Sequence, residues 1–508
     1  MKRYSDLEYL KLPKWKRFLY TLMCVIVGIP GGIWGAVKSA AQKVWQFVRG
    51  IWMDIMEIGV TFLEGDWKTK ISFVVMGFGN IARGQILRGL LFLAAEVVFI
   101  FYMVTTGTYW LGKLDNLGDV GPSKVYDPVY DMYTPTYGDD SFKILLYGVL
   151  TVFFIIAMVY TWRLNVKQNR ISEQILKSGK KLKSGKDDLK SLVDDQFHKT
   201  LLALPLTGIL VFTVMPIVFM ILVAFTNYDG LHNGYTNQLF TWVGLTNFNE
   251  LLHWSAGGAD YSATFGEVLT WTLIWAVFAT FTNYFLGMGV AMMINKKGIK
   301  LKKFWRTCLV MTIAVPQFIS LLYVSKMFAN DGLINGFLMN MDLIEKPLPF
   351  WTDPVWARVT VILVNIWIGI PYLMLMATGI LMNIPQDLYE SAKIDGANGW
   401  QQYTKITLPY MLFITGPYLL TSFTGNMNNF NVIYLLTGGA PTSTLPSPGG
   451  ALGSTDLLVT WLFKLTTTEA ADYNTASVIG ILVFVVVALI SLVVYNVLPS
   501  TRNEEDFQ

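Results

Sequence analysis

The stretch ASVIGILVFVVVALISLVVYNV, residues 476–497, contains no charged side chain. About 20 apolar residues in a helix are enough to cross the hydrocarbon core of a bilayer. Helices are favoured there because the backbone must satisfy its own polar groups in lipid. Seven further apolar runs of helical length occur at 87–106, 142–161, 200–225, 265–294, 304–328, 355–382 and 409–436. The sequence therefore predicts an all-α, polytopic membrane protein with about eight transmembrane helices.

Composition agrees with this class of protein. Of the 508 residues, 53% are hydrophobic and 15% are charged, whereas soluble chains carry about 25% charged residues. Two cysteines in apolar segments, Cys24 and Cys308, make no disulfide framework. The three histidines lack the spacing of metal ligands. We therefore expect no metal, no cofactor and no catalytic cluster in this chain.

The positions of lysine and arginine predict the orientation in the membrane, because these residues concentrate on cytoplasmic loops. Residues 162–199 hold ten of them and 295–303 hold five, whereas 226–264 hold none. Residues 107–141 hold two, against six aspartates. The segments expected in the cytoplasm are the N-terminus, 162–199, 295–303, 383–408 and the C-terminus.

Five parts are predicted along the chain. An N-terminal cytoplasmic or interfacial amphipathic region covers 1–86. Within it, residues 18–63 suit interfacial helices or a hairpin, and a basic start without a cleavage site favours a retained segment over a signal peptide. The other predicted parts are a pair of spans with a short external loop (87–161), a basic linker (162–199), a six-span core (200–500) and a tail (501–508).

A cytoplasmic loop carries the most informative pattern, NIPQDLYESAKIDGANGWQQYTKITL at 383–408, followed by Pro409. Pro385 and Asp387 mark a helix start. Two helical turns are expected from Leu388 to Asp395, with Gly396 as the left-handed cap, and a second short helix from about 398 to 407. Such a loop is either an ordinary amphipathic connection or a bent pair of helices that docks into a partner.

Three short motifs in this loop resemble the EAA loop of ABC importer permeases. They are Glu390-Ser391-Ala392, Asp395-Gly396-Ala397 and Ile406-Thr-Leu408-Pro409, with Ser391 where the family usually has alanine. The resemblance implies that the loop is the coupling helix that docks into a separate ATPase. The expected coupling residues are Glu390, Ser391, Ala392, Asp395, Gly396 and Ala397.

Further motifs narrow the resemblance to the larger permease subunit of maltose/maltodextrin importers (MalF-like), over roughly 200–500. They are Trp242 to Phe248, Ala314-Val315-Pro316, Asn365 to Tyr372, Asn428-Asn429-Phe430 and Leu435 to Pro441. The resemblance implies a six-helix type I importer core that works by alternating access. Its implied partners are a second permease subunit (MalG-like), a dimeric ATP-binding subunit, an extracellular solute-binding lipoprotein and an oligosaccharide substrate.

Two polar stripes occur at helical spacing within the apolar runs. The first comprises Asn365, Ile368, Gly369 and Tyr372, and the second Ser422, Gly425, Asn426 and Asn429. Amides and hydroxyls can bind sugar hydroxyls, but polar stripes can also join helices to one another. The resemblance implies that both stripes line the sugar site, together with Ile313 and Gln317.

Three of these positions depart from the family's maltose site. Gly425 and Ile313 stand where that site has aromatic residues, and Gln317 stands where it has serine. Fewer aromatic rings leave less stacking surface and more room. We therefore expect longer or differently shaped α-glucans, or another oligosaccharide, as substrate.

Other functions are less well supported by the residues. Gly77-Phe-Gly79-Asn-Ile-Ala82 fits a dinucleotide fingerprint but has no βαβ unit around it. The basic linker has no interleaved aromatics, so nucleic acid is not expected, and contact with anionic membrane lipid is. A secondary transporter would carry ionisable residues deep in the membrane, where only Glu96 and Lys326 qualify.

Overall fold

The computed structural model describes residues 38–497, except 39–41, 47, 137, 183–184, 235–237, 254–260, 297, 451 and 469–470. Contacts divide this part of the chain into two compact units, 38–247 and 248–497. The predicted start of the core at residue 200 differs from this division, which leaves the span 197–223 with the first unit. The predicted tail at 501–508 and all residues before residue 38 lie outside the described residues.

Within the described residues, seven helices are long and apolar enough to cross a membrane. They are Ile86–Gly112, Ser141–Lys177, Phe197–Val223, Ser262–Asn295, Pro354–Leu381, Gly399–Met427 and Tyr473–Tyr495. An eighth candidate is a pair of shorter helices, Lys302–Ala314 and Gln317–Met327. The predicted polytopic, all-α class is confirmed, with one short β-ribbon as the exception.

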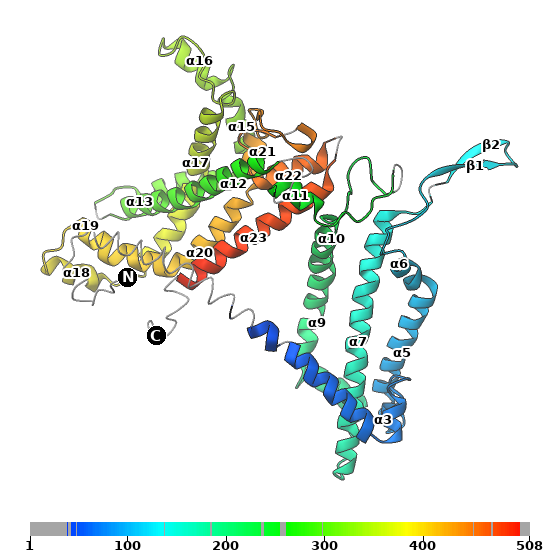
Figure 1. Cartoon of the computed structure of the whole chain (residues 1–508). Coiled ribbons are helices and arrows are strands. Elements are labelled where there is room, and N and C mark those ends of the chain that lie inside the picture. The colour runs from blue at the N-terminus through cyan, green and yellow to red at the C-terminus, as the bar shows by residue number, and fades with distance from the viewer. Residues whose placement is uncertain are drawn as a thin grey trace, which may run out of the picture. The chain divides into compact units, whose positions relative to one another are not determined.

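The first unit contains three of these candidate spans together with shorter elements, and Figure 1 shows their course. Its helices are α3 (Trp67–Ile71), α4 (Phe78–Ile81), α5 (Ile86–Tyr102), η1 (Met103–Gly107), α6 (Thr108–Gly112), α7 (Ser141–Lys177), α8 (Gly185–Val193), α9 (Phe197–Ile209), η2 (Leu210–Val214) and α10 (Met215–Val223). Strands β1 (Ser123–Asp127) and β2 (Met132–Thr136) pair antiparallel, with Ser123 opposite Thr136. In Figure 1, this ribbon lies near the end of α7 opposite to α3.

The glycine-rich segment around Gly77 packs between α5 and α7. Asn165 of α7 accepts a hydrogen bond from Gly77 N at 2.9 Å and donates to Ser72 O at 2.8 Å. Glu96 of α5 accepts from Met76 N at 2.8 Å. The look-alike fingerprint therefore forms a tethered loop and one helical turn, and Glu96 has a structural hydrogen bond within the fold.

The second unit holds the remaining helices. They are α11 (Thr246–Leu252), α12 (Ser262–Val277), η3 (Phe278–Thr282), α13 (Asn283–Asn295), α14 (Lys302–Ala314), α15 (Gln317–Met327), α16 (Leu333–Asn340), α17 (Pro354–Leu381), α18 (Gln386–Ile394), α19 (Gly399–Gln402), η4 (Tyr403–Thr407), α20 (Leu408–Met427), α21 (Phe430–Leu436), η5 (Pro448–Gly450), α22 (Leu458–Thr467) and α23 (Tyr473–Val497). In Figure 1, α18 and α19 lie toward one end of α20, and α21 and α22 toward the other.

Two clusters of buried side chains hold this unit together. Trp271, Trp275, Leu321, Val361 and Ile433 belong to one cluster, which joins α12, α15, α17 and α21. The other joins α13, α17 and α20 around buried aromatic and sulfur-containing side chains, and it includes Tyr284, Met288, Met374 and Met411. α13 and α17 approach closely because glycines face the partner helix at two levels: a Cβ at Gly287 would overlap Leu373, and one at Gly369 would overlap Asn283.

Two predicted spans are interrupted. The run 304–328 bends by 91° between α14 and α15, because Pro316 has an extended backbone and no amide proton to continue the helix. The run 409–436 ends as a helix at Met427, since Asn429 caps a new helix by accepting from Val432 N at 3.3 Å. Neither of these two runs therefore forms one continuous helix.

Candidate functional site

The loop 383–408 forms the predicted bend. Helix α18 runs from Gln386 to Ile394, with Pro385 at its N-cap and Asp387 in its first turn. Gly396 follows with a φ of +78°, a left-handed conformation that glycine adopts without a Cβ clash. Asn398 then accepts from Gln401 N while the Gln401 side chain accepts from Asn398 N, both at 2.8 Å. The glycine and the capping box together build a sharp corner between two helices.

The second arm of this corner differs from the expected short helix. From Gly399, the chain continues without interruption through α19, η4 and α20 as one helix of 29 residues that ends at Met427. A π-turn absorbs the junction at 403–407. The corner is therefore covalently continuous with the transmembrane helix that carries Ser422, Gly425 and Asn426.

The outer face of the corner is exposed. Glu390, Ser391, Asp395 and Gly396 are exposed, and Ala392 and Ala397 are half-buried. Two large apolar side chains also face outward: Ile394 is 87% exposed and Trp400 is 71% exposed. The sequence analysis missed these two residues, although an isoleucine and a tryptophan beside a capping glycine on a polar loop were a usable signal. Exposed apolar groups rimmed by polar ones are typical of an interaction surface.

Part of the two polar stripes comes together between α17 and α20. The rings of Tyr372 and Tyr418 lie 6.4 Å apart between centroids, and the Tyr418 side chain lies beside Ser422, one helical turn further along α20. Tyr372 is 54% exposed. Tyr418, four residues before Ser422 on the same helix face, was missed by the sequence analysis and joins the two stripes.

The asparagines of the second stripe bind neighbouring elements. Asn426 donates from Nδ2 to Thr280 Oγ1 at 3.0 Å, and its carbonyl accepts from Trp275 Nε1 at 3.1 Å. Asn429 donates to Asn426 Oδ1 at 3.4 Å. Because α20 ends at Met427, Asn429 does not share a helix face with Ser422, and that part of the predicted spacing was wrong.

The remaining predicted residues occupy four different surroundings. Asn365 is buried on α17 beside Gly369, next to Asn283 of α13. Gly425 is exposed, and a Cβ there would meet open space. Ile313 and Gln317 are exposed on either side of the bend between α14 and α15. Ile368 packs against the buried cluster around Trp271.

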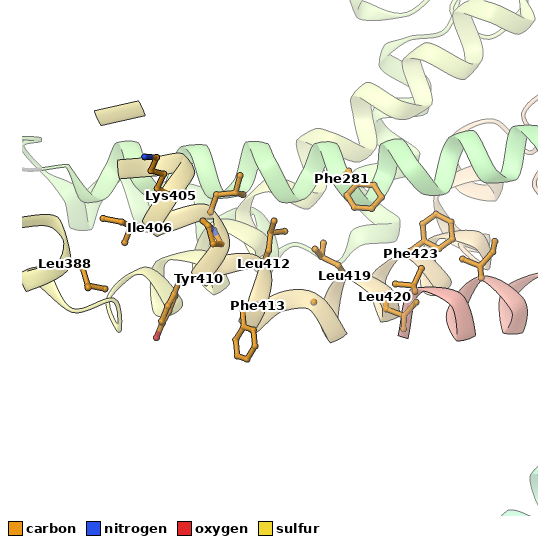
Figure 2. Close-up of a pocket in the computed structure, with 15 residues that line it drawn as sticks. Phe281, Leu388, Lys405, Ile406, Tyr410, Leu412, Phe413, Leu419, Leu420 and Phe423 are labelled. Atoms are coloured by element: carbon orange, nitrogen blue, oxygen red, sulfur yellow. The ribbon is translucent and has the colours of Figure 1, made fainter. Parts of the chain in front are cut away.

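A large groove of about 1010 Å³ lies along α20, as Figure 2 shows. Leu388 and Lys405 lie toward one end, and Phe423 toward the other. Its lining is almost wholly apolar: Phe281, Leu388, Lys405, Ile406, Leu408, Pro409, Tyr410, Leu412, Phe413, Gly416, Leu419, Leu420, Phe423, Ile490 and Val494. Sugar hydroxyls need donors and acceptors, so the groove does not suit a sugar, and the polar stripes do.

One helix therefore joins the exposed corner to the polar patch between α17 and α20. Residues 283–503 match the family "Binding-protein-dependent transport system inner membrane component". The chain belongs to this family of ABC importer permeases, since it also covers nearly the whole length of relatives at 33% identity.

Three of these relatives are named for two kinds of sugar, maltodextrins and galactooligosaccharides. The maltodextrin permease MalC of Streptococcus pneumoniae is 33% identical, with 86% of this chain and 97% of MalC covered. The maltodextrin permease MdxF of Bacillus subtilis has the same identity and coverage. The galactooligosaccharide permease GanP of Bacillus subtilis is also 33% identical, with 85% of this chain and 97% of GanP covered.

Proposed function

We propose that this permease imports maltodextrin-like oligosaccharides, with the polar stripes of α17 and α20 as the sugar site. Tyr372 and Tyr418 offer ring faces, and Ser422 offers a hydroxyl, at the point where the two helices meet. Aromatic faces with a few polar groups suit the alternating apolar and hydroxyl surfaces of a sugar. The maltodextrin specificity of two relatives supports this substrate class over others.

The single observation that carries the proposal is the 29-residue helix from Gly399 to Met427. At 1.5 Å per residue it spans about 43 Å, from the exposed corner to the polar patch. Because the corner and these residues lie on one uninterrupted helix, a displacement at the corner can be transmitted along that helix to Ser422 and Asn426. The movement that accompanies ATP hydrolysis on a separate subunit would be transmitted to the permease at this corner.

The corner has the chemistry of a docking surface for that ATPase. Ile394 and Trp400 can be buried in an apolar cleft, and Glu390 can pair with a cationic side chain of the partner. A partner shifts a two-state equilibrium only by binding one state better than the other. In this proposal the nucleotide-dependent shape of the ATPase dimer supplies that difference, and this chain hydrolyses no ATP.

The groove along α20 is proposed to receive a transmembrane helix of a second permease subunit. From Lys405 to Phe423 it follows α20 for about 27 Å, close to the thickness of the hydrocarbon core, about 30 Å. The span 197–223 of this chain is an example of a helix that could fill such a groove. It is apolar, and only 6% of its most apolar 18 residues are buried. A second subunit of the same family would bring a similar helix.

The membrane orientation follows from the same proposal. The corner at 386–402 faces the cytoplasmic ATPase, and the loop after α21 faces the extracellular solute-binding protein. The cytoplasmic position of both termini remains a prediction, since 1–37 and 498–508 lie outside the described residues.

The test is uptake by the complete complex in proteoliposomes, supplied with maltodextrins of increasing length and with galactooligosaccharides. We expect ATP-dependent uptake of maltodextrins and none driven by a proton or sodium gradient alone. Uptake of galactooligosaccharides only would replace the substrate assignment while leaving the transport class intact. Uptake driven by an ion gradient without ATP would overturn both.

A further inference from the structure

We propose that Asn283 and Asn365 together bind one hydroxyl group, from the transported sugar or from water, where α13 crosses α17. This inference rests on the proposed sugar site and adds a residue, Asn283, that neither polar stripe contains. It assigns to the crossing a hydroxyl-binding role beyond helix packing.

Asn283 is held against Asn365 by the backbone. It is the first residue of α13, directly after the π-turn η3, and π-turns are frequent at functional sites. Its Nδ2 donates to the main-chain carbonyl of Asn365 at 3.5 Å. A Cβ at Gly369 would overlap the same amide, so only glycine there lets Asn283 sit this close to α17.

The two side chains leave one acceptor and one donor without a partner. Asn283 is 7% exposed and Asn365 is 6% exposed. Within the part of the chain that the structure describes, Asn283 Oδ1 and Asn365 Nδ2 are buried and form no hydrogen bond. An unsatisfied buried polar group costs about 1–3 kcal/mol, so such atoms in a native protein call for a ligand or a second conformation.

A hydroxyl is the smallest group that satisfies both atoms. It donates its proton to the Asn283 carbonyl oxygen and accepts from the Asn365 amide. Rotating the Asn283 amide by half a turn does not remove the problem. It would set Oδ1 against the Asn365 carbonyl oxygen, and two acceptors cannot bond.

The crossing is connected to the rest of the sugar site. Thr280, three residues before Asn283, accepts from Asn426 of α20, and Asn365 lies on the same face of α17 as Tyr372. η3 and α13 therefore contact both polar stripes. A hydroxyl bound at Asn283 would therefore be linked to both α17 and α20.

The experiment is a double-mutant cycle between Asn283→Leu and Asn365→Leu, read as kcat/KM for uptake by the complete complex. Each single variant is expected to lose about ten-fold, the size of one charge-neutral hydrogen bond, and the double variant the same ten-fold. A hundred-fold loss, additive for the two, would overturn the shared hydroxyl. Thr280→Val combined with Asn365→Leu is the matched control and should be additive, because Thr280 bonds Asn426.

Singly deoxygenated maltodextrins separate the two sources of the hydroxyl. If the sugar supplies the hydroxyl, the unmutated protein transports one deoxygenated analogue poorly. Asn283→Leu then transports that analogue and the unmodified maltodextrin equally well. If water supplies it, the cycle stays non-additive and every analogue keeps its ranking in the variant. An analogue whose defect persists in Asn283→Leu but vanishes in Asn365→Leu would overturn the role of Asn283.

Two precautions keep the result interpretable. Should Asn283→Leu fail to assemble with its partners, Asn283→Ser keeps a smaller polar group and enters the same cycle. The cycle is also measured on ATP hydrolysis by the complex. If the complex takes up no oligosaccharide, the proposed function is refuted. If the effects of Asn283→Leu and Asn365→Leu on ATP hydrolysis are additive, the shared hydroxyl is refuted independently of that result.

Discussion

Single residues with special backbone or packing requirements decide how the corner and the site work. Gly396 turns the chain between α18 and α19 with a φ of +78°. Gly425 lies on the exposed face of α20 with open space where a side chain would begin. The first glycine is required by its conformation and the second by the room it leaves, so substitutions there have different consequences.

Gly396→Pro should uncouple ATP hydrolysis from uptake. Proline requires a φ near −65°, so the corner must change shape, and a strained position of this kind costs of order 1–3 kcal/mol. We expect uptake to fall at least ten-fold while the protein still inserts in the membrane. Hydrolysis and uptake are measured together on the reconstituted complex.

Gly399→Ala is the matched control for that variant. Gly399 is three residues away, exposed and helical, and a Cβ there meets nothing within 4 Å. Alanine favours a helix over glycine by about 1 kcal/mol, so uptake should be retained. Normal uptake by Gly396→Pro would contradict the role of the corner.

Gly425→Phe should shift the substrate preference toward shorter sugars. The added ring occupies open space beside Ser422 and Asn426 and supplies a stacking surface. We expect the ratio of maltose to maltoheptaose uptake to rise several-fold, as measured by competition between labelled sugars. Gly379→Phe, at an equally open position nearer the corner, should leave the ratio unchanged. An unaltered ratio in Gly425→Phe would place the sugar elsewhere.

At the scale of elements, stability comes from side chains that tie short segments to long helices. The loop before α7 is closed by Asp139, which accepts from Lys113 Nζ at 2.6 Å and from the backbone of Asp119 and Val120 at 2.9 and 3.1 Å. Burial alone would raise the pKa of Asp139, but these hydrogen bonds outweigh it and lower the pKa to about 2.

This carboxylate predicts how the loop responds to pH. A pKa lowered from 3.8 to about 2 corresponds to about 2 kcal/mol of stabilisation. It is fully present above pH 4 and is lost as the pH falls toward 2. Hydrogen exchange should therefore show the loop 113–139 losing protection over that window.

Asp139→Asn should produce the same loosening at pH 7, because a neutral amide cannot form the ion pair with Lys113. Asp115→Asn, in the same loop, is the control and should keep the protection of the parent protein. Unchanged exchange in Asp139→Asn at pH 7 would show that the loop is held by other contacts.

At the scale of the whole molecule, the groove along α20 is apolar and is left uncovered by the described residues, which is why we propose a second subunit as its occupant. In a chain in which Cys24 and Cys308 are replaced by alanine, the variant Phe413→Cys, in the middle of the groove, should cross-link to the second permease subunit. A cysteine at Phe484, which is 71% exposed on α23 outside the groove lining, should not. The Phe413→Cys variant is also labelled with a lipid-phase reagent. Equal labelling in the isolated subunit and in the assembled complex would exclude a protein occupant of the groove.

Much of this protein was predictable because local physics determined it. Long uncharged runs can satisfy their backbone groups only as helices, so the spans and the all-α class followed from the sequence. The conformation of Gly396 followed from the short polar pattern around it. The EAA-like motif, by its place between two spans, indicated the corner.

Tertiary structure decided what depends on partners distant in the chain. That Tyr418 meets Tyr372, and that Asn426 bonds Thr280 and Trp275, is set by packing between segments tens of residues apart. Asn283 acquires its position only because Gly369, 86 residues later, lets α13 approach α17. Helical periodicity reports the faces of one helix, whereas the pairing of faces between helices is a property of the assembled core.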